Sequence, residues 1–465
     1  MTEITNSTGL VDVEAMLVTA QSAASEFKSF DQAQVEKILQ AVASAANDKA
    51  EFYAEWSVRE TGFGCVEDKV KKNKRNSLGL LEAYKCSDYI DSQIDEEKKI
   101  ISFPKPAGVV VALAPCTNPV ATIYYKAMIS LMTRNAIIFC PHPASKDCCS
   151  HAADLVAAAA EAAGAPRGTI QVLRNPSIPV VNELMQSRLT NLILATGGPA
   201  MVRAAYSSGN PAMGVGPANV ACYVHRTADL DRAAETIVFG NCYDNSLPCT
   251  CESVVLVDND VADQLKSKLQ CSGAYFVKPF EEASLRTLLF DSHDVTDKRE
   301  MPLGKSAKWL AERAGFSIPD GTKSLVIEIN QIGESEPVSK EKMFPVLGFI
   351  RVADHKEAIA HAQSMLSLMG KGHSAVVHSE DPKVVIEYGK SLPVCRIAVN
   401  TSGAAGSAGV TTNLGRSSVI GTGYFGGGSI DENVGPKHLV QWTRVAYGKE
   451  VEVNMHNVER AAKNK

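Results

Sequence analysis

The run Gly108-Val-Val-Val-Ala-Leu-Ala114 leads directly into Pro115-Cys-Thr-Asn-Pro119 and then into an apolar stretch over residues 120–133. Consecutive apolar, β-branched positions are typical of a strand that is buried on both faces of a sheet. Asn118 followed by Pro119 favours a helix that begins at the proline, with the asparagine as its N-cap residue. A buried strand, a short turn and a helix together form the first half of a βαβ unit.

The same alternation continues along the chain. Further strands are predicted at residues 136–140, 169–173, 191–195 and 219–224, with helices at 150–163 and 180–186. A second alternating segment from about 226 to 425 contains strands near 253–257, 324–329, 349–352, 374–378 and 397–399. Residues 11–100 look mostly helical, and a last strand is expected at 438–446. The pattern predicts an α/β protein with two domains that face a cleft, where ligands bind beyond the carboxyl ends of parallel strands.

Length and composition narrow the class of protein. A chain of 465 residues, 45% hydrophobic and 21% charged, predicts a globular protein of two or three domains. Its net charge of -5 offers no general attraction for nucleic acid or an anionic membrane. No apolar run is long enough for a membrane span and no signal peptide is visible, so a cytoplasmic protein is expected. The 12 cysteines form no Cys-x-x-Cys pair, which favours a reducing compartment and no metal site.

One cysteine lies in a setting that suits a nucleophile. Cys249 belongs to Asn245-Ser-Leu-Pro-Cys-Thr-Cys-Glu-Ser253, a loop between a predicted amphipathic helix and a predicted buried strand. Such a loop holds a side chain rigidly and still lets it reach a cleft. A half-buried packing role is the commoner fate of a cysteine, so the loop alone leaves both readings open. Cys251 is expected to be a packing residue.

Other turns carry groups that suit a carbonyl substrate and a phosphate. If the side-chain oxygen of Asn118 caps its helix, the amide NH2 remains free to donate to an oxyanion. The turn Thr196-Gly-Gly-Pro199 follows a strand and precedes a helix, a place where backbone approaches phosphate, although a tight turn explains the glycines equally well. Gly214-Val-Gly-Pro-Ala-Asn219 offers no carboxylate or histidine as a general base. Gly372-His-Ser374 reads as a polar turn at the entrance to a strand.

Taken together and in order, these motifs resemble the aldehyde dehydrogenase superfamily, specifically its coenzyme A-acylating branch, and the resemblance runs from about residue 12 to 447. The matching pieces are Pro115–Pro119, Ala195-Thr-Gly-Gly198, Gly214–Asn219, Tyr243-Asp-Asn-Ser-Leu-Pro-Cys249, Glu341-Lys-Met-Phe-Pro-Val346, Gly372-His-Ser374, Arg396-Ile-Ala-Val-Asn400 and Asn413-Leu-Gly415. The resemblance implies an aldehyde dehydrogenase-like α/β fold. It consists of a Rossmann-like dinucleotide-binding domain at 1–225 with an arm near 90–107, a catalytic domain at 226–425, and a return segment with an oligomerisation strand at 426–465.

The resemblance also implies roles for individual residues. Cys249 corresponds to the nucleophile and Asn118 to the side-chain donor for the oxyanion. Glu341 matches the carboxylate that binds the nicotinamide ribose, and Phe344 should line the nicotinamide pocket. The other positions implied to contact the dinucleotide are Pro115, Thr117, His142, Thr196, Gly197, Gly198 and Gly214. No metal is implied.

The implied reaction oxidises a short aldehyde to its acyl-coenzyme A through a thioester on Cys249, and the implied assembly is a homodimer or homotetramer. Hydrolytic relatives carry a glutamate in the motif matching Gly214–Asn219, and its absence favours a thiol acceptor, coenzyme A, over water. An acyl-phosphate reductase, a hydrolytic dehydrogenase and a non-catalytic protein remain alternatives. Cys140-Pro-His-Pro143 lacks the lysine and glutamate that many hydrolytic relatives place around the adenosine ribose, so NAD and NADP both remain open.

Arg416 follows Asn413-Leu-Gly415, where close relatives usually have a small residue. A solvated surface arginine is the commoner case. If it faces the cleft, its guanidinium suits the anionic tail of an aldehyde such as succinate semialdehyde or sulfoacetaldehyde. Residues 449–465 match no known motif.

Overall fold

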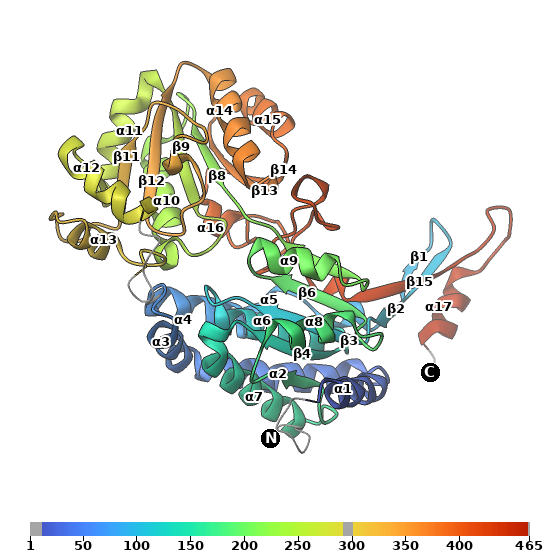
Figure 1. Cartoon of the computed structure of the whole chain (residues 1–465). Helices are drawn as coiled ribbons and strands as arrows, with labels where there is room; N and C mark the ends of the chain where they lie inside the picture. The colour runs from blue at the N-terminus through green and yellow to red at the C-terminus, as the bar shows by residue number, and fades with distance from the viewer. Residues whose placement is uncertain (1–11, 292–300, 464–465) are drawn as a thin grey trace.

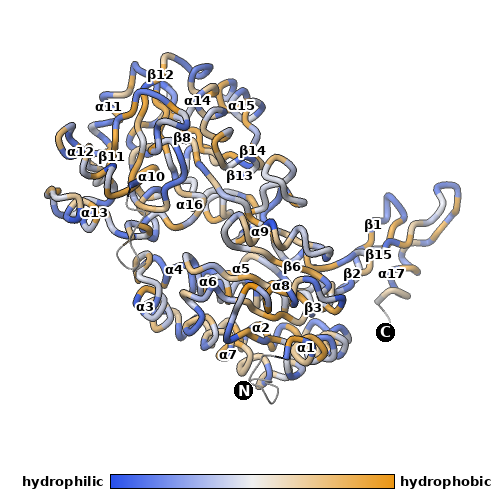
Figure 2. Tube along the Cα trace, viewed as in Figure 1, coloured by the Kyte–Doolittle hydropathy of each residue, from blue (hydrophilic) through white to orange (hydrophobic). Residues whose placement is uncertain are grey.

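Two α/β lobes and a projecting arm make up the molecule. The computed structural model describes residues 12–291 and 301–463, so the outermost ends of the predicted first and last domains lie outside the described residues. Figure 1 shows the lobes one above the other, with the arm extending sideways from the lower lobe and the C-terminus close to it. In Figure 2 hydrophobic segments gather inside each lobe and hydrophilic ones at its rim. No described helix has both the length and the apolar character needed to cross a bilayer.

The lower lobe is built on a parallel sheet with the strand order β5-β4-β3-β6-β7. Its strands are β3 (Val109–Ala114), β4 (Ala136–Pro141), β5 (Ile170–Val172), β6 (Leu192–Thr196) and β7 (Ala212–Val215). Its helices are α1 (Val13–Phe27), α2 (Gln32–Asp48), α3 (Ala50–Thr61), α4 (Val66–Arg75), α5 (Leu78–Ala83), α6 (Pro119–Met132), α7 (Lys146–Ala162), α8 (Ile178–Gln186) and α9 (Pro199–Tyr206). The strand order reverses between β3 and β6, so the turns that follow these two strands meet at one crevice.

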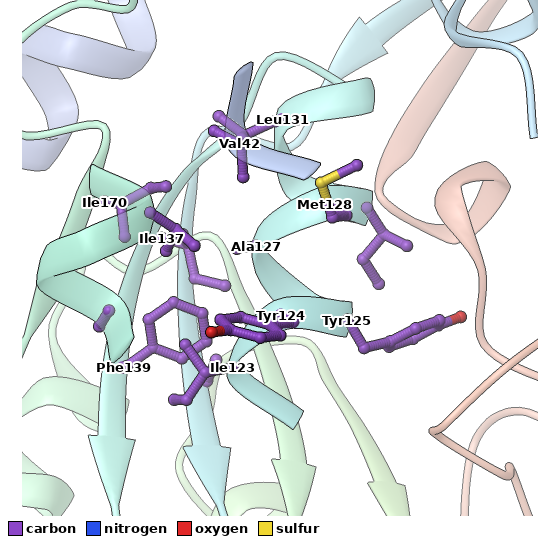
Figure 3. Close-up of a cluster of buried hydrophobic side chains, with 14 of the residues drawn as sticks. Val42, Ile123, Tyr124, Tyr125, Ala127, Met128, Leu131, Ile137, Phe139 and Ile170 are labelled. Atoms are coloured by element: carbon purple, nitrogen blue, oxygen red, sulfur yellow. The ribbon is translucent and has the colours of Figure 1, made fainter. Parts of the chain in front are cut away.

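Alternation along β3 explains why both faces of this sheet are covered. Val110 and Ala112 join the core formed with α2, α6 and α7. Val109 and Val111 point the other way, into the core formed with α1, α8 and α9. Figure 3 shows the first core, where Tyr124 and Tyr125 of α6 lie among aliphatic side chains. Because every residue of β3 is buried, this strand is a rigid support for the turn that follows it.

The upper lobe contains a parallel sheet with the order β10-β11-β12-β9-β8-β13-β14. Its strands are β8 (Val220–Val224), β9 (Glu252–Asp258), β10 (Ala274–Phe276), β11 (Ser324–Glu328), β12 (Val346–Val352), β13 (Gly372–His378) and β14 (Val394–Val399). Its helices are α10 (Leu230–Cys242), α11 (Asn259–Cys271), α12 (Pro279–Arg286), α13 (Ala307–Arg313), α14 (His355–Leu368), α15 (Pro382–Ser391) and α16 (Gly403–Gly406). Helices pack on both faces here too, which gives the lobe two cores.

The assignment of strands to the two sheets differs from the sequence prediction in one place. The strand predicted at residues 219–224 is β8, but it pairs with β9 and β13 of the upper sheet. The fifth strand of the lower sheet is instead β7, which overlaps the first two residues of the Gly214–Asn219 motif. The chain therefore changes sheets at residues 216–219, before the predicted boundary at 225. The reason is that apolar pattern identifies a strand but not the sheet it joins.

The arm is a three-stranded antiparallel sheet of β1 (Gln93–Asp95), β2 (Ile100–Pro106) and β15 (Val440–Ala446), with β2 in the centre. Residues 100–106 pair with 440–446 along their whole length, so an early segment of the chain is joined here to a late one. The strand predicted at 438–446 and the arm predicted near 90–107 thus belong to one sheet. A final helix, α17 (Met455–Lys463), follows β15 and lies beside the arm in Figure 1.

Candidate active site

A cavity of about 480 Å³ lies where the carboxyl ends of β3 and β6 face the amino ends of the upper-lobe strands. Most of the residues predicted to form the site line it: Pro115, Thr117, Asn118, His142, Thr196, Gly197, Gly198, Cys249 and Glu341. Three turns of the lower lobe, after β3, β4 and β6, and the segments that precede β9 and β12 of the upper lobe supply them. The structure thus brings together groups that are up to 226 residues apart, from Pro115 to Glu341.

Three predicted residues lie elsewhere. Phe344 is buried beside a small adjoining pocket that it shares with Cys249 and Glu341. Gly214 lies within β7, where its backbone N–H donates to the hydroxyl of Tyr206, and it does not line the cavity. Arg416 also lies outside the cavity lining, because its guanidinium donates to the carbonyl of Gly79 at 3.0 Å. The condition attached to Arg416, that it face the cleft, is therefore not met.

The turn before Cys249 has an unusual backbone. Asp244, Asn245 and Ser246 have φ angles of 48°, 53° and 64°, the left-handed region that non-glycine residues rarely adopt. Side chains of the turn hold it in place. An Asp244 carboxylate oxygen accepts from the backbone N–H of Cys65 at 2.8 Å, and the Asn245 amide donates to the carbonyl of Gly304 at 2.9 Å. The path of the chain into Cys249 is thus fixed by contacts with distant segments.

His373 is the nearest polar partner of the Cys249 sulfur. Its Nε2 lies 3.1 Å from Cys249 Sγ. Burial, and then the carboxylate of Glu341, raise the pKa of Cys249 to about 12. Burial, and then the charge of Arg396, lower the pKa of His373 to about 3. Near neutral pH the proton therefore stays on sulfur, and a neutral imidazole is aligned to accept it.

His373 is held at its ring and at its backbone. The ring Nδ1 lies 2.9 Å from the hydroxyl of Ser374, and the backbone carbonyl of His373 accepts from the Arg396 guanidinium at 2.8 Å. The sequence reading of Gly372-His-Ser374 as a polar turn missed this role. His373 lies at the amino end of β13, and Cys249 and Glu341 precede β9 and β12 of the same parallel sheet. Only the strand order brings these three strand entrances together.

Asn118 is oriented differently from the expectation. It is the N-cap residue of α6, but its side chain makes no capping hydrogen bond. Its Oδ1 accepts instead from the ammonium of Lys72 at 2.5 Å. Because an ammonium can only donate, it selects the amide oxygen and turns the NH2 group away. The capping expectation is wrong, yet the free donor that it predicted is present by another route.

Lys72 belongs to a buried charge cluster that joins the lobes. Lys69 and Lys72 of α4 both donate to the same carboxylate oxygen of Asp244, and Lys69 also donates to the carbonyl of Thr117 at 3.1 Å. All three charged side chains are almost completely buried. One negative charge between two positive ones offsets much of the desolvation of each. The cluster ties the oxyanion donor to the turn that carries the nucleophile.

The other half of the cavity fits a dinucleotide. The hydroxyl of Thr196 is buried without a hydrogen-bond partner among the described residues, so it is available to a ligand. A Cβ placed on Gly198 would meet nothing within 4 Å, which leaves room beside the N-terminus of α9. Helix N-termini favour phosphate, and the Glu341 carboxylate suits ribose hydroxyls. Burial raises the pKa of Glu341 to about 7. Within the described ranges, no His, Cys, Asp or Glu cluster is placed to hold a metal ion.

Comparison with known proteins establishes the family. Residues 2–275 match the model of the aldehyde dehydrogenase family. The chain is 33% identical over 446 residues to succinate-semialdehyde dehydrogenase (acetylating) of Clostridium kluyveri, covering 95% of this chain and 97% of that protein. A crystal structure of an acetylating aldehyde dehydrogenase from Geobacillus thermoglucosidasius superposes with a TM-score of 0.90 at 36% identity, covering 95% of this chain and 97% of that one. The chain belongs to the aldehyde dehydrogenase family, as its motifs predicted.

Other curated relatives are longer than this chain. The bifunctional aldehyde-alcohol dehydrogenase AdhE of Escherichia coli K12 is 38% identical over 448 residues, which cover 94% of this chain but 50% of the relative. The chain thus spans about half the length of such relatives.

Proposed function

We propose that this protein is a coenzyme A-acylating aldehyde dehydrogenase that uses NAD or NADP and converts a short aldehyde to its acyl-coenzyme A. The observation that carries the proposal is the 3.1 Å contact between the buried His373 Nε2 and Cys249 Sγ, because Cys249 lines a cavity together with Asn118. A nucleophile and an oxyanion donor in one cavity, with a proton acceptor in contact with the nucleophile, are what thioester formation from an aldehyde requires. The similarity to proteins named as acetylating dehydrogenases supports the same reaction.

In the first step the Cys249 sulfur bonds to the aldehyde carbon and its proton passes to His373 Nε2. The carbonyl oxygen becomes an oxyanion, which the NH2 of Asn118 and the backbone N–H of Cys249 stabilise. Lys72 keeps the Asn118 amide in the orientation in which it can donate. Arg396, which donates to the backbone carbonyl of His373, holds the backbone of that residue in place.

The second step breaks the C–H bond of the adduct and restores the carbonyl as a thioester on Cys249. A bound nicotinamide supplies the hydride acceptor for this chemistry. We assign Thr196, Gly197 and Gly198 to its phosphates, Glu341 to a ribose, and Pro115, Thr117 and His142 to further contacts. His373 then releases its proton to solvent, which restores the neutral imidazole.

In the third step coenzyme A takes the acyl group. Its thiol gives a proton to His373 and attacks the thioester, and Cys249 leaves as a thiolate that recovers that proton. Glu341 is the carboxylate that lines the cavity within the described part of the chain, and the 215–217 segment of the lining contributes no acid. Without a further carboxylate to activate water, a thiol is the better acceptor, since it is partly ionised near neutral pH.

The test follows reduced nicotinamide by absorbance with NAD or NADP and a short aldehyde, with and without coenzyme A. Turnover should depend on the thiol. Equal rates without coenzyme A would point to a hydrolytic enzyme, and strict dependence on phosphate would point to an acyl-phosphate reductase. Cys249→Ala should abolish turnover and retain dinucleotide binding, whereas retained turnover would contradict the assigned nucleophile.

A further inference from the structure

Arg75 is the charged group of the cavity that the proposed reaction does not use. It is the last residue of α4, three positions after Lys72, so both side chains lie on the same face of the helix. Both line the cavity. Three residues of an α-helix rise by about 4.5 Å, which places Arg75 one turn away from the group that holds the oxyanion donor. A substrate tail of a few atoms spans such a distance.

No residue that the structure describes forms an ion pair with Arg75. The charged side chains of the cavity lining are Lys72, Arg75 and Glu341. Lys72 is paired with Asp244. Arg75 forms no hydrogen bond or ion pair with any residue that the structure describes, and it is half-buried. The charge of Arg75 affects Tyr243, which also lines the cavity. Burial raises the pKa of Tyr243 overall, and the charge of Arg75 acts to lower it.

The neighbouring polar groups are already occupied. The Asn76 amide donates to the carbonyl of Ala121 at 2.8 Å and to the hydroxyl of Ser418 at 2.9 Å. The Thr122 hydroxyl donates to the carbonyl of Asn118, and the Ser417 hydroxyl donates to the carbonyl of Val434 at 2.8 Å. Among the charged side chains that line the cavity, the Arg75 guanidinium is therefore the donor without a partner in the described residues.

Small or apolar side chains line the same cavity, among them Ala121, Ala404, Ala408 and Ile420. They offer no group that competes with the guanidinium for an anion. Apolar surroundings strengthen a hydrogen bond between a guanidinium and an anion, because water screens the charges less there.

We propose that Arg75 is the anchor for an anionic tail, a carboxylate or a sulfonate, on the aldehyde substrate. The proposal rests on the proposed function and adds the substrate class to it. It assigns to Arg75 the recognition that Arg416 could not provide, since the Arg416 guanidinium is bound to Gly79 outside the cavity.

The test compares aldehydes of one chain length with and without a negative charge, 4-oxobutanoate and butanal, in the unsubstituted enzyme and in Arg75→Leu. For 4-oxobutanoate, kcat/KM should fall by about 10- to 100-fold, the worth of a charge-assisted hydrogen bond. For butanal it should stay the same or rise, and KM for coenzyme A and for the dinucleotide should not change. Arg75→Lys should recover part of the loss, and sulfoacetaldehyde with propanal repeats the comparison for a sulfonate.

Lys74→Leu is the matched control, because it removes the same charge from the neighbouring, exposed position on α4. It should leave both aldehydes unaffected. An equal loss for 4-oxobutanoate and butanal in Arg75→Leu, or an unsubstituted enzyme that prefers butanal, overturns the anchor. A rise in KM for coenzyme A in Arg75→Leu, with no change for the aldehydes, would mean that Arg75 binds the phosphates of coenzyme A instead.

A second experiment needs no turnover, so it tests the role of Arg75 separately from the proposed function. Unreactive 4-hydroxybutanoate should protect Cys249 from alkylation by iodoacetamide, whereas 1-butanol at the same concentration should not. Arg75→Leu should lose that protection. Protection that survives Arg75→Leu, or no protection by the anion in the unsubstituted protein, contradicts the anchor even if the protein turns over no aldehyde at all.

Discussion

At the scale of single residues, the nucleophile and the oxyanion donor each have one side-chain partner, His373 for Cys249 and Lys72 for Asn118. Cys249 could be singled out from its motif, and so could Asn118. Their partners His373 and Lys72 lie 124 and 46 residues away from them. A histidine after Gly372 and a lysine on a polar helix each have an ordinary structural reading. Their roles depend on side-chain contacts across the cavity, which no local pattern encodes.

Lys72→Met should lower kcat about 10-fold or more, because the Asn118 amide loses the contact that orients it. Asn118→Ala should cost about 10²- to 10³-fold. If Lys72 acts through Asn118, the double variant should be no slower than Asn118→Ala alone. Steady-state kinetics of the three variants, with their melting temperatures, provide the measurement.

Lys69→Met is the control for this comparison of the two single variants with the double variant. It also removes a buried charge from Asp244 but leaves the Asn118 contact in place. Its kcat should stay closer to that of the unsubstituted enzyme even if its melting temperature falls as far. Additive losses in the Lys72/Asn118 double variant would rule out a positioning role.

Glu341→Gln should make Cys249 more reactive. Above the pKa of Glu341, about 7, its carboxylate is charged and raises the pKa of the thiol, so the neutral amide should lower that pKa. The pH profile of Cys249 alkylation by iodoacetamide should then shift to lower pH. A profile that stays in place, or moves to higher pH, would show that Glu341 has no charge effect on the sulfur.

At the scale of elements, most helices and central strands could be predicted because their apolar pattern is long and regular. β7 could not, because Ala212–Val215 is short and contains a glycine. The arm could be assigned from family resemblance, but the pairing of 100–106 with 440–446 joins distant segments and has no local signal. The order of the strands in each sheet had to come from the structure. That order brings the amino ends of β9, β12 and β13 close together.

Two helix-interior glycines should respond in opposite ways to alanine. Gly389 in α15 is exposed, and a Cβ there meets only an ordinary contact at 3.9 Å, so Gly389→Ala should stabilise the protein by up to about 1 kcal/mol. A Cβ on Gly240 in α10 would lie 1.9 Å from a carboxylate oxygen of the buried Glu252. Gly240→Ala should therefore destabilise it. Denaturant unfolding of both variants checks the sign, and stabilisation by Gly240→Ala would mean that Glu252 can move aside.

At the scale of the whole molecule, the arm presents an edge to a second chain. β15 is an edge strand, and Val445 on it is 43% exposed. Unpaired strand edges favour pairing with another copy, so the protein should sediment as a dimer or larger assembly. Val445→Asp should shift the equilibrium toward the single chain. A monomer at micromolar concentration in the unsubstituted protein would contradict an oligomerisation role for the arm.

The lower lobe also contains a buried lysine that should make stability depend on pH. Lys126 of α6 donates to the carbonyls of Leu113 and Leu194, and burial lowers its pKa to about 7. In the unfolded chain the same group titrates near 10.4, so between about pH 7 and 10 the unfolded state binds more protons. Relative to Lys126→Met, the unsubstituted protein should gain stability from pH 7 to pH 9, by at most about 1.4 kcal/mol per pH unit. Denaturant unfolding of both proteins at pH 7 and pH 9 checks this. An equal difference in the free energy of unfolding at the two pH values would show that Lys126 does not link stability to pH.

The buried cluster of Lys69, Lys72 and Asp244 has a consequence for how the enzyme completes a cycle. α4 belongs to the lower lobe and Asp244 to the upper one, and their contacts tie α4 to the turn that leads into Cys249. Moving the lobes apart would expose three buried charges. It would also remove contacts that hold the turn of residues 244–246, whose backbone is in the left-handed region. We expect the lobes to act as one rigid frame from one turnover to the next. Substrates and products would then exchange through the mouths of the cavity rather than by hinge opening.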